Sequence, residues 1–161
     1  MAEARNAGIG NLRGRPVKAT GSGGTAEYVL DNQVGYLLRL ASQRHLAIFH
    51  RQMQLELTPT QFSALIRLSE VGECSQNDLG RRAHVDVATI KGVVDRLEAK
   101  GLVASADNPA DRRQRVISLT ELGIAELDRL MHIGHEITAE TLEPLPAEDR
   151  QKLLTLLSRL L

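Results

Sequence analysis

Three arginines, Arg112, Arg113 and Arg115, lie close together in the segment DNPADRRQR. An Asn-Pro pair is typical of a turn, and the flanking runs LVASA and RVISL have strand-like composition, so this segment is predicted to be the tip of a β-hairpin. A guanidinium on an exposed tip can enter a narrow minor groove of DNA, where the negative potential is enhanced. Asp111, two residues before Arg113, could hold that guanidinium in a fixed orientation. A solvated, charged turn is the alternative interpretation.

The segment before this hairpin predicts two helices joined by a short turn. SQNDLGRRA forms the first helix, residues 84–86 form the turn, and DVATIKGVVDRLEAK forms the second helix. Asp86 is expected to cap the second helix by accepting backbone N–H groups, and Gly101 lies where a helix end needs a left-handed residue. Apolar residues recur at helical spacing along the second helix and should face a core: Ile90, Val93, Val94 and Leu97.

Polar residues on the opposite face of this second helix could contact DNA. Thr89 and Lys91 lie near its N-terminus, and a recognition helix presents its early residues to the major groove, where each base pair has a distinct pattern of donors and acceptors. For the second helix considered alone, an ordinary amphipathic helix is the alternative. The full set of candidate DNA-binding residues is Ser75, Gln76, Thr89, Lys91, Arg96, Asp111, Arg112, Arg113 and Arg115.

From about Val34 to the C-terminus, the sequence resembles the MarR family of transcriptional regulators. Three blocks carry the resemblance, in the family's order: LTPTQFSALIRL, VVDRLEAKGLV and DNPADRRQRVISLTELG. The resemblance implies a winged helix-turn-helix in an obligate homodimer, with recognition helices in successive major grooves, wings in the flanking minor grooves and, usually, repression relieved by a small ligand. It places Thr89 and Lys91 in the base-reading part of the helix. It places Asp111 and Arg113 on the wing, with Arg113 entering the minor groove.

Composition favours a mainly α-helical fold, to which the predicted hairpin adds a small β-wing. The 161 residues suffice for one domain with a sizeable core, and 42% hydrophobic with only 2% aromatic residues suits aliphatic helix packing. The formal net charge is zero, but the charge is unevenly distributed. Residues 75–119 contain eight Lys and Arg against six Asp and Glu, whereas residues 120–161 contain four against eight. The predicted DNA-binding region is therefore more basic than the C-terminal region.

The segments around the winged helix-turn-helix predict a helical platform for dimerisation. Residues 28–57 are expected to form one long helix and residues 121–161 further helices, on either side of a winged helix-turn-helix at residues 58–120. Thr58 and Thr120 are expected to cap the helices that follow them. The last helix, AEDRQKLLTLLSRLL, is rich in leucine. Its apolar surface is larger than one small domain can cover, so it should pack against a second subunit. A two-fold dimer places its recognition helices about 34–36 Å apart, which predicts a pseudo-palindromic operator.

Residues 1–27 form a separate, glycine-rich segment. It contains too little apolar surface to fold by itself, so we expect a flexible tail. Because the segment contains Arg13, Arg15 and Lys18, a basic arm that touches DNA is the alternative.

Polar residues of the first predicted helix are candidates for binding a small ligand. In the MarR family, small aromatic acids and phenols commonly bind between the dimer platform and the DNA-binding region, in a crevice lined by the first two helices. An arginine there could pair with a carboxylate, while Tyr, Gln and His could orient ring substituents. Solvation or dimer contacts are the alternative roles. We therefore expect a small anionic aromatic effector bound by Tyr36, Arg39, Ser42, Gln43, His45 and Phe62.

Two other sensing chemistries are alternatives to an aromatic effector. Cys74, the single cysteine, lies just before the helix-turn-helix, where a small core residue is expected, although a redox-responsive thiol is the alternative. His132 and His135 lie three residues apart beside Glu136, a spacing that can bring two zinc ligands to one side of a helix. Solvent-exposed histidines are the commoner outcome of such a pattern. No bound metal and no cofactor are therefore expected.

The sequence contains none of the motifs that would indicate an enzyme. A G-x-G-x-x-G loop, a P-loop and a nucleophile elbow are all absent. A winged helix used for protein contact, without DNA binding, is a further alternative, and the hairpin arginines argue against it. No apolar stretch reaches membrane-spanning length, and the N-terminus lacks the apolar run of a secretory signal. Together with the single cysteine, these features predict a cytoplasmic protein.

Overall fold

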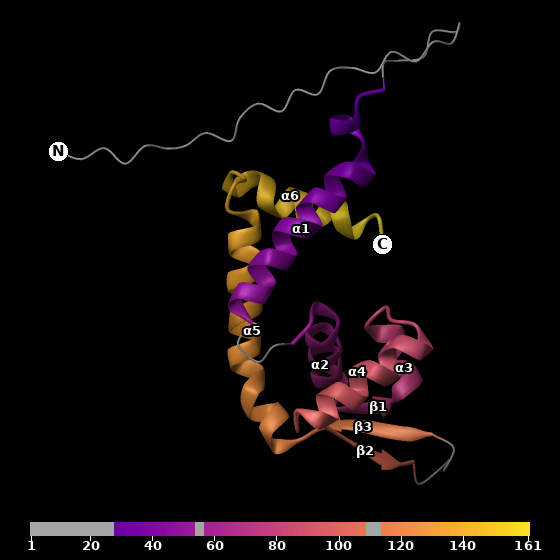
Figure 1. Cartoon of the computed structure of the whole chain (residues 1–161). Helices are drawn as coiled ribbons and strands as arrows, with labels where there is room; N and C mark the ends of the chain where they lie inside the picture. Colours follow the sequence, from indigo (N-terminus) through magenta and orange to yellow (C-terminus); the bar gives the residue numbers. More distant parts are fainter. Residues whose placement is uncertain (1–27, 54–56, 109–113) are drawn as a thin grey trace, which may run out of the picture. The chain divides into compact units, whose positions relative to one another are not determined.

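The structure is a computed structural model that describes residues 28–53, 57–108 and 114–161 (Figure 1). The chain divides into two units, residues 1–41 and residues 42–161, and the boundary falls within the first α-helix. The second unit contains the predicted helix-turn-helix and the β-hairpin.

In the described part of the first unit, a short 3-10 turn precedes the α-helix, which starts later than predicted. The turn η1 is Leu30–Asn32, and helix α1 is Val34–Gln52. The predicted start at Tyr28 is wrong, because Val29 and Gln33 have extended backbone conformations, with ψ angles of 114° and 126°. The side-chain amide of Gln33 donates to the Val29 carbonyl oxygen at 3.1 Å and closes the turn.

The second unit contains the C-terminal part of α1, which ends at Gln52 rather than at the predicted residue 57. Helices α2, α3 and α4 lie together beside three strands, and α5 follows the last strand (Figure 1). The predicted helix-turn-helix and the predicted hairpin are both confirmed. The bounds of the elements are α2 (Pro59–Val71), β1 (Glu73–Ser75), α3 (Gln76–Arg82), α4 (Val87–Ala99), β2 (Val103–Asp107), β3 (Arg115–Leu119), α5 (Glu121–Leu142) and α6 (Ala147–Ser158).

The three strands form one antiparallel sheet in the order β1-β3-β2. Strands β2 and β3 pair as the predicted hairpin, with Ser105 opposite Ile117. Strand β1 pairs with the other edge of β3, with Cys74 opposite Ile117. The sequence did not predict β1, because Glu-Cys-Ser is too short and too polar to give a strand pattern. This strand leads into α3 and places the start of that helix beside the tip end of the hairpin, with Ser75 opposite Val116.

Capping residues mark where several of the helices begin or end. At the start of α2, Thr58 and Gln61 form a reciprocal capping box, with distances of 2.9 and 3.2 Å. At the start of α5, the Thr120 hydroxyl accepts the Gly123 amide at 3.0 Å. Gly101 follows α4 with a left-handed φ of 71°. The predicted roles of Thr58, Thr120 and Gly101 are confirmed.

The core of the second unit is aliphatic, and α4 contributes one face to it. The predicted stripe of α4 is buried, and its side chains are at most 2% exposed. It packs with fully buried side chains from α2, α3 and β3. Because the stripe is buried, the opposite face of α4 must point outward. The core residues concerned are Leu65, Leu68, Leu79, Ile90, Val93, Val94, Leu97 and Ile117.

Helix α5 binds the C-terminal part of α1 through Glu140. Its carboxylate accepts hydrogen bonds from Arg51 and from the side-chain amide of Gln52, the latter at 2.6 Å. Arg44 donates to the backbone oxygen of Glu140 at 3.1 Å. The hydrogen bond from Arg51, followed by that from Gln52, lowers the pKa of the Glu140 carboxyl. The contact is therefore charge-assisted at neutral pH.

Gly123 lies where α5 passes close to the chain that follows α4. A Cβ atom on Gly123 would lie 2.0 Å from the Leu102 carbonyl oxygen, and that oxygen is held by the Thr120 amide at 3.2 Å. We predict that Gly123→Ala lowers the free energy of unfolding by about 3 kcal/mol, because the backbone must move. The matched control is Gly92→Ala, whose Cβ would meet only the end of the Arg96 side chain at 3.6 Å. Urea unfolding measures both; a Gly123→Ala midpoint equal to that of the wild type would contradict the close approach.

Candidate functional site

The outward face of α4 presents a compact set of side chains to solvent. Its first turn exposes Val87, Ala88 and Thr89, and the next turns expose Lys91 and Arg96. The predicted outward position of Thr89 and Lys91 is therefore confirmed, and Arg96, a further candidate, is exposed as well. The guanidinium of Arg96 lies along the helix, beside the position where a Gly92 side chain would be.

Asp86 caps α4 and also binds the side chain of Thr89. One carboxylate oxygen accepts the Thr89 amide at 2.9 Å, and the other accepts the Thr89 hydroxyl at 2.7 Å. The hydroxyl, followed by the amide, lowers the pKa of the Asp86 carboxyl. The predicted cap is confirmed. The hydroxyl proton of Thr89 is used within the protein, which the sequence did not indicate.

A second group of predicted residues gathers where α3 and β3 begin. Ser75, Gln76 and Arg115 line a small hollow of about 170 Å³, together with Asn77 and Gln114. Ser75 caps α3 by accepting the amide of Asp78 at 3.2 Å, and Arg115 donates to the Ser105 carbonyl oxygen at 3.2 Å. The structure thus brings Ser75, Gln76 and Arg115 together.

The remaining wing residues that were predicted to bind DNA lie outside the described residues. They are Asp111, Arg112 and Arg113. Their roles remain predictions.

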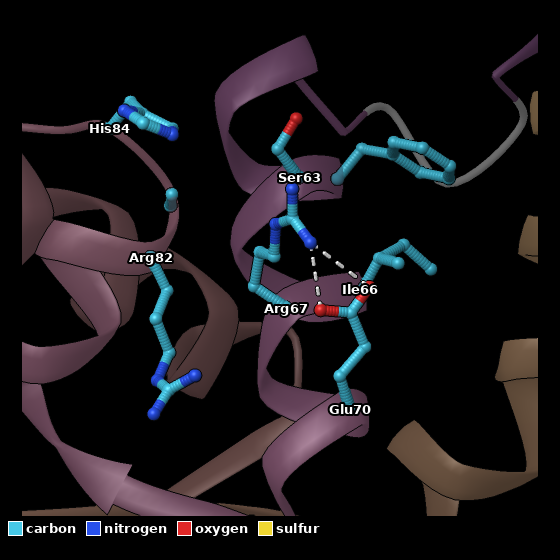
Figure 2. Close-up of a pocket in the computed structure, with 8 residues that line it drawn as sticks. Ser63, Ile66, Arg67, Glu70, Arg82 and His84 are labelled. Carbon is cyan, nitrogen blue, oxygen red and sulfur yellow. Dashed lines mark hydrogen bonds and ion pairs between the residues drawn. The ribbon is translucent and has the colours of Figure 1, made fainter.

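A larger hollow, of about 350 Å³, lies between α2 and the end of α3. Figure 2 shows Arg67 and Glu70 on α2, with Arg82 and His84 on the other side of the hollow. Arg67 binds Glu70 at 2.9 Å, and Arg82 binds Asp78 at 2.7 Å. Apolar and small polar groups complete the lining: Phe62, Ser63, Ile66 and Ala83.

His84 has an unusual backbone conformation at the edge of this hollow. Its φ of 52° is the only positive value of a non-glycine residue among the described residues. Such a conformation is costly for an L side chain and persists because the surrounding structure fixes it. Val85, the next residue, is held by its amide, which donates to the Gly80 carbonyl oxygen at 2.8 Å. The turn between α3 and α4 is therefore tightly determined.

The sequence did not predict this hollow. Arg67, Arg82 and His84 come from separate segments, and only the i,i+3 and i,i+4 spacing of the two arginines to Glu70 and Asp78 was visible in the sequence. Such spacing predicts surface ion pairs rather than a binding site. The one residue of this hollow that was predicted to bind a ligand is Phe62.

Phe62 belongs to a group of rings formed by α1 and α2. Its ring lies 5.9 Å from that of Phe49 in an edge-on arrangement, and the His45 ring lies 6.3 Å from Phe49 on the same helix. His45 also hydrogen bonds to the Thr141 hydroxyl at 3.1 Å. A Cβ on Gly134 would lie 2.9 Å from the Phe62 ring, so α5 fits closely against it. The structure brings His45 and Phe62 to the same aromatic group.

The other predicted ligand residues lie on α1. In the first unit, the Arg39 guanidinium lies 5.1 Å from the centre of the Tyr36 ring, a cation–π contact, so these two side chains share a flank of the helix as predicted. In the second unit, Ser42 and Gln43 are exposed. No ligand contact follows from this geometry alone.

Cys74 has the environment of a core residue rather than of a reactive thiol. It is partly buried against the core. Burial, followed by the nearby charge of Asp78, raises the pKa of the Cys74 thiol. A raised pKa disfavours the reactive thiolate, which argues against the redox alternative.

The histidines of α5 show a simple surface contact. His132 lies 3.4 Å from Glu136, one turn away, and His135 is exposed. Within the described ranges, no three His, Cys, Asp or Glu side chains are placed to hold a metal ion. No helix in the same part of the chain is long and apolar enough to cross a membrane.

The helix-turn-helix of α3 and α4, followed by the β2–β3 hairpin, defines a winged helix-turn-helix, a class of DNA-binding fold. Comparison with known families identifies the kind of winged helix-turn-helix more closely: the model of the MarR family matches residues 57–114. Together with the relative described next, this match shows that the chain belongs to the MarR family.

Several relatives are similar over most of their length. The HTH-type transcriptional repressor NicR of Pseudomonas putida (strain KT2440) is 41% identical over 135 residues, which cover 83% of this chain and 85% of NicR. A solved structure of a probable transcriptional regulator from Pseudomonas aeruginosa is 44% identical, with a TM-score of 0.80, and covers 83% of this chain and 100% of that chain. BpsR of Bordetella bronchiseptica, whose DNA binding is regulated by 6-hydroxynicotinic acid, is 37% identical, with a TM-score of 0.78, over 84% of this chain and 97% of that chain. These relatives are regulators, not enzymes.

Proposed function

We propose that the chain is a homodimeric transcriptional repressor that binds a pseudo-palindromic DNA operator and is released from it by a small aromatic acid. The observation that carries this proposal is the outward face of α4, which exposes Lys91 and Arg96 and whose orientation is fixed by the buried stripe. The similarity to the repressor NicR over 83% of the chain supports it.

In this proposal, α4 enters the major groove and the start of α3 contacts the DNA backbone. Ser75, Gln76 and Arg115 line one hollow near the tip end of the hairpin, where hydrogen-bond donors and a guanidinium can contact phosphates. Arg112 and Arg113 directly precede Arg115 in the chain, so in this proposal they would enter the adjacent minor groove. Asp111 would orient Arg113.

Exposed apolar side chains support the proposed dimer. In the first unit, Leu37 and Leu38 are 51% and 46% exposed; in the second unit, Leu156 and Leu160 are 48% and 70% exposed. Large apolar side chains that a single subunit leaves exposed in such number often belong to a subunit interface. The dimerisation region would therefore comprise residues 28–57 and 121–161, with residues 58–120 as the DNA-binding region.

The hollow between α2 and α3 is suited to an aromatic acid. Phe62 offers a ring and Ile66 an aliphatic surface, while Arg67, Arg82 and His84 can bind a carboxylate or a ring substituent. Both arginines are now paired with acidic side chains on their own helices, and a ligand carboxylate would compete with these surface pairs. Surface pairs of this kind are weak, so such competition is feasible.

Because of the position of the hollow, a ligand bound there could change the position of α4. One wall is α2, and the other is the end of α3 and His84, which lead directly into the Asp86 cap. A ligand that changes the gap between these walls would move the start of α4 relative to DNA. The polar residues of α1, with Tyr36 and Arg39 foremost, form the second candidate set for the same ligand.

Lys91→Ala should weaken DNA binding and reduce its dependence on salt. We expect the slope of log affinity against log salt to fall by roughly 1 for each subunit, if Lys91 contacts a phosphate. Fluorescence anisotropy on the DNA upstream of the gene measures this. The matched control is Lys152→Ala on α6, which removes the same charge from an exposed position. Equal effects of the two variants, or no binding by the wild type at moderate salt, would contradict the proposal.

Arg67→Ala and Arg39→Ala distinguish the two candidate ligand sites. With the protein bound to its DNA, 6-hydroxynicotinic acid and related aromatic acids are titrated until half of the complex is released. We expect Arg67→Ala to raise the concentration required by roughly tenfold, because a charge-assisted hydrogen bond is lost, and Arg39→Ala to leave it unchanged. The reverse result would assign the ligand to α1. Release by peroxide or zinc, but by no acid, would support the redox or metal alternative instead.

A further inference from the structure

Val87 is an exposed apolar residue in an unusual place. It is 64% exposed, and among the described residues between 57 and 120 it is the one large apolar side chain that the structure leaves exposed. It is also the first residue of α4. The described leucine, isoleucine and other valine side chains of this region are buried or partly buried. Packing within the subunit therefore does not account for a valine at this position.

The rest of the first turn of α4 offers no side-chain donor for hydrogen bonds to DNA. Ala88 has only a methyl group, and the Thr89 hydroxyl donates to Asp86 at 2.7 Å. The other carboxylate oxygen of Asp86 accepts the Thr89 amide. Asp86 therefore holds Thr89 through both its backbone and its side chain. Residues 87–89 thus present mainly methyl groups outward.

This surface matches one chemical group in the major groove. Guanine presents two acceptors there, adenine an acceptor and a donor, and cytosine a donor, whereas thymine presents a C5-methyl group beside its acceptor. Acceptors on the bases need donors from protein side chains, and the side chains of the first turn of α4 have none to give. An apolar turn gains most from contact with the thymine methyl, because burial of both groups removes apolar surface from water.

We propose that Val87, supported by Ala88, reads thymine in the operator through its C5-methyl group. This inference rests on the proposed function, since it requires that α4 enter the major groove. Lys91 lies one turn further along the same face and supplies the donor for a neighbouring acceptor or phosphate. A valine at this position loses little side-chain freedom on contact, because β-branching already restricts its rotamers.

The test uses the full chain and DNA duplexes selected by it from a random pool. In each selected half-site, thymines are replaced one at a time by deoxyuridine, which keeps base pairing and removes only the methyl group. We expect one thymine per half-site at which the replacement weakens wild-type binding by roughly fourfold for each methyl contacted. With Val87→Ala, the same replacement should have a clearly smaller effect.

Lys91→Ala serves as the control variant, because it should weaken binding to both duplexes equally and keep the full effect of deoxyuridine. Equal binding of wild-type protein to all thymine and deoxyuridine duplexes would overturn the proposal while leaving DNA binding intact. An effect that is the same size in Val87→Ala would overturn the role of Val87. If no duplex is selected from the pool, both this inference and the proposed function are wrong.

Discussion

The burial of one face of α4 is the constraint on which the rest of the structure depends. Ile90, Val93, Val94 and Leu97 are at most 2% exposed, so the helix cannot rotate about its axis without exposing aliphatic side chains or burying Lys91. A shift of one residue turns the helix by about 100° and would do both. The Asp86 cap fixes where the helix begins. Core packing thus determines which side chains of α4 face outward and can contact a partner.

The elements that line the hollow between α2 and the end of α3 are closely packed. Helix α2 is positioned by the contact of Phe62 with Phe49 and by its close fit to Gly134 of α5. On the other side, α3 ends at Arg82 and α4 begins at Val87, and the turn between them contains the left-handed His84. A ligand that pushes these walls apart would therefore act on the start of the recognition helix.

Local sequence patterns predicted the features that depend on interactions between residues close in the chain. The capping residues Thr58, Asp86 and Thr120 gave the helix starts, and the spacing of Ile90 to Leu97 gave the buried face of α4. Strand β1 was missed because its pairing with β3 joins segments far apart in the chain. The hollow lined by Arg67 and Arg82 was missed for the same reason, and the Thr89–Asp86 hydrogen bond depends on a side-chain rotamer that no pattern specifies.

In the proposed complex, two copies of α4 enter successive major grooves of one operator. Dimethyl sulfate footprinting tests it directly, because the reagent attacks guanine N7 in the major groove and adenine N3 in the minor groove. On the upstream duplex, we expect two patches of N7 protection with centres about 10 base pairs apart, flanked by protected adenines where the wings lie. A single patch of N7 protection, or protection of the minor groove alone, would contradict the account.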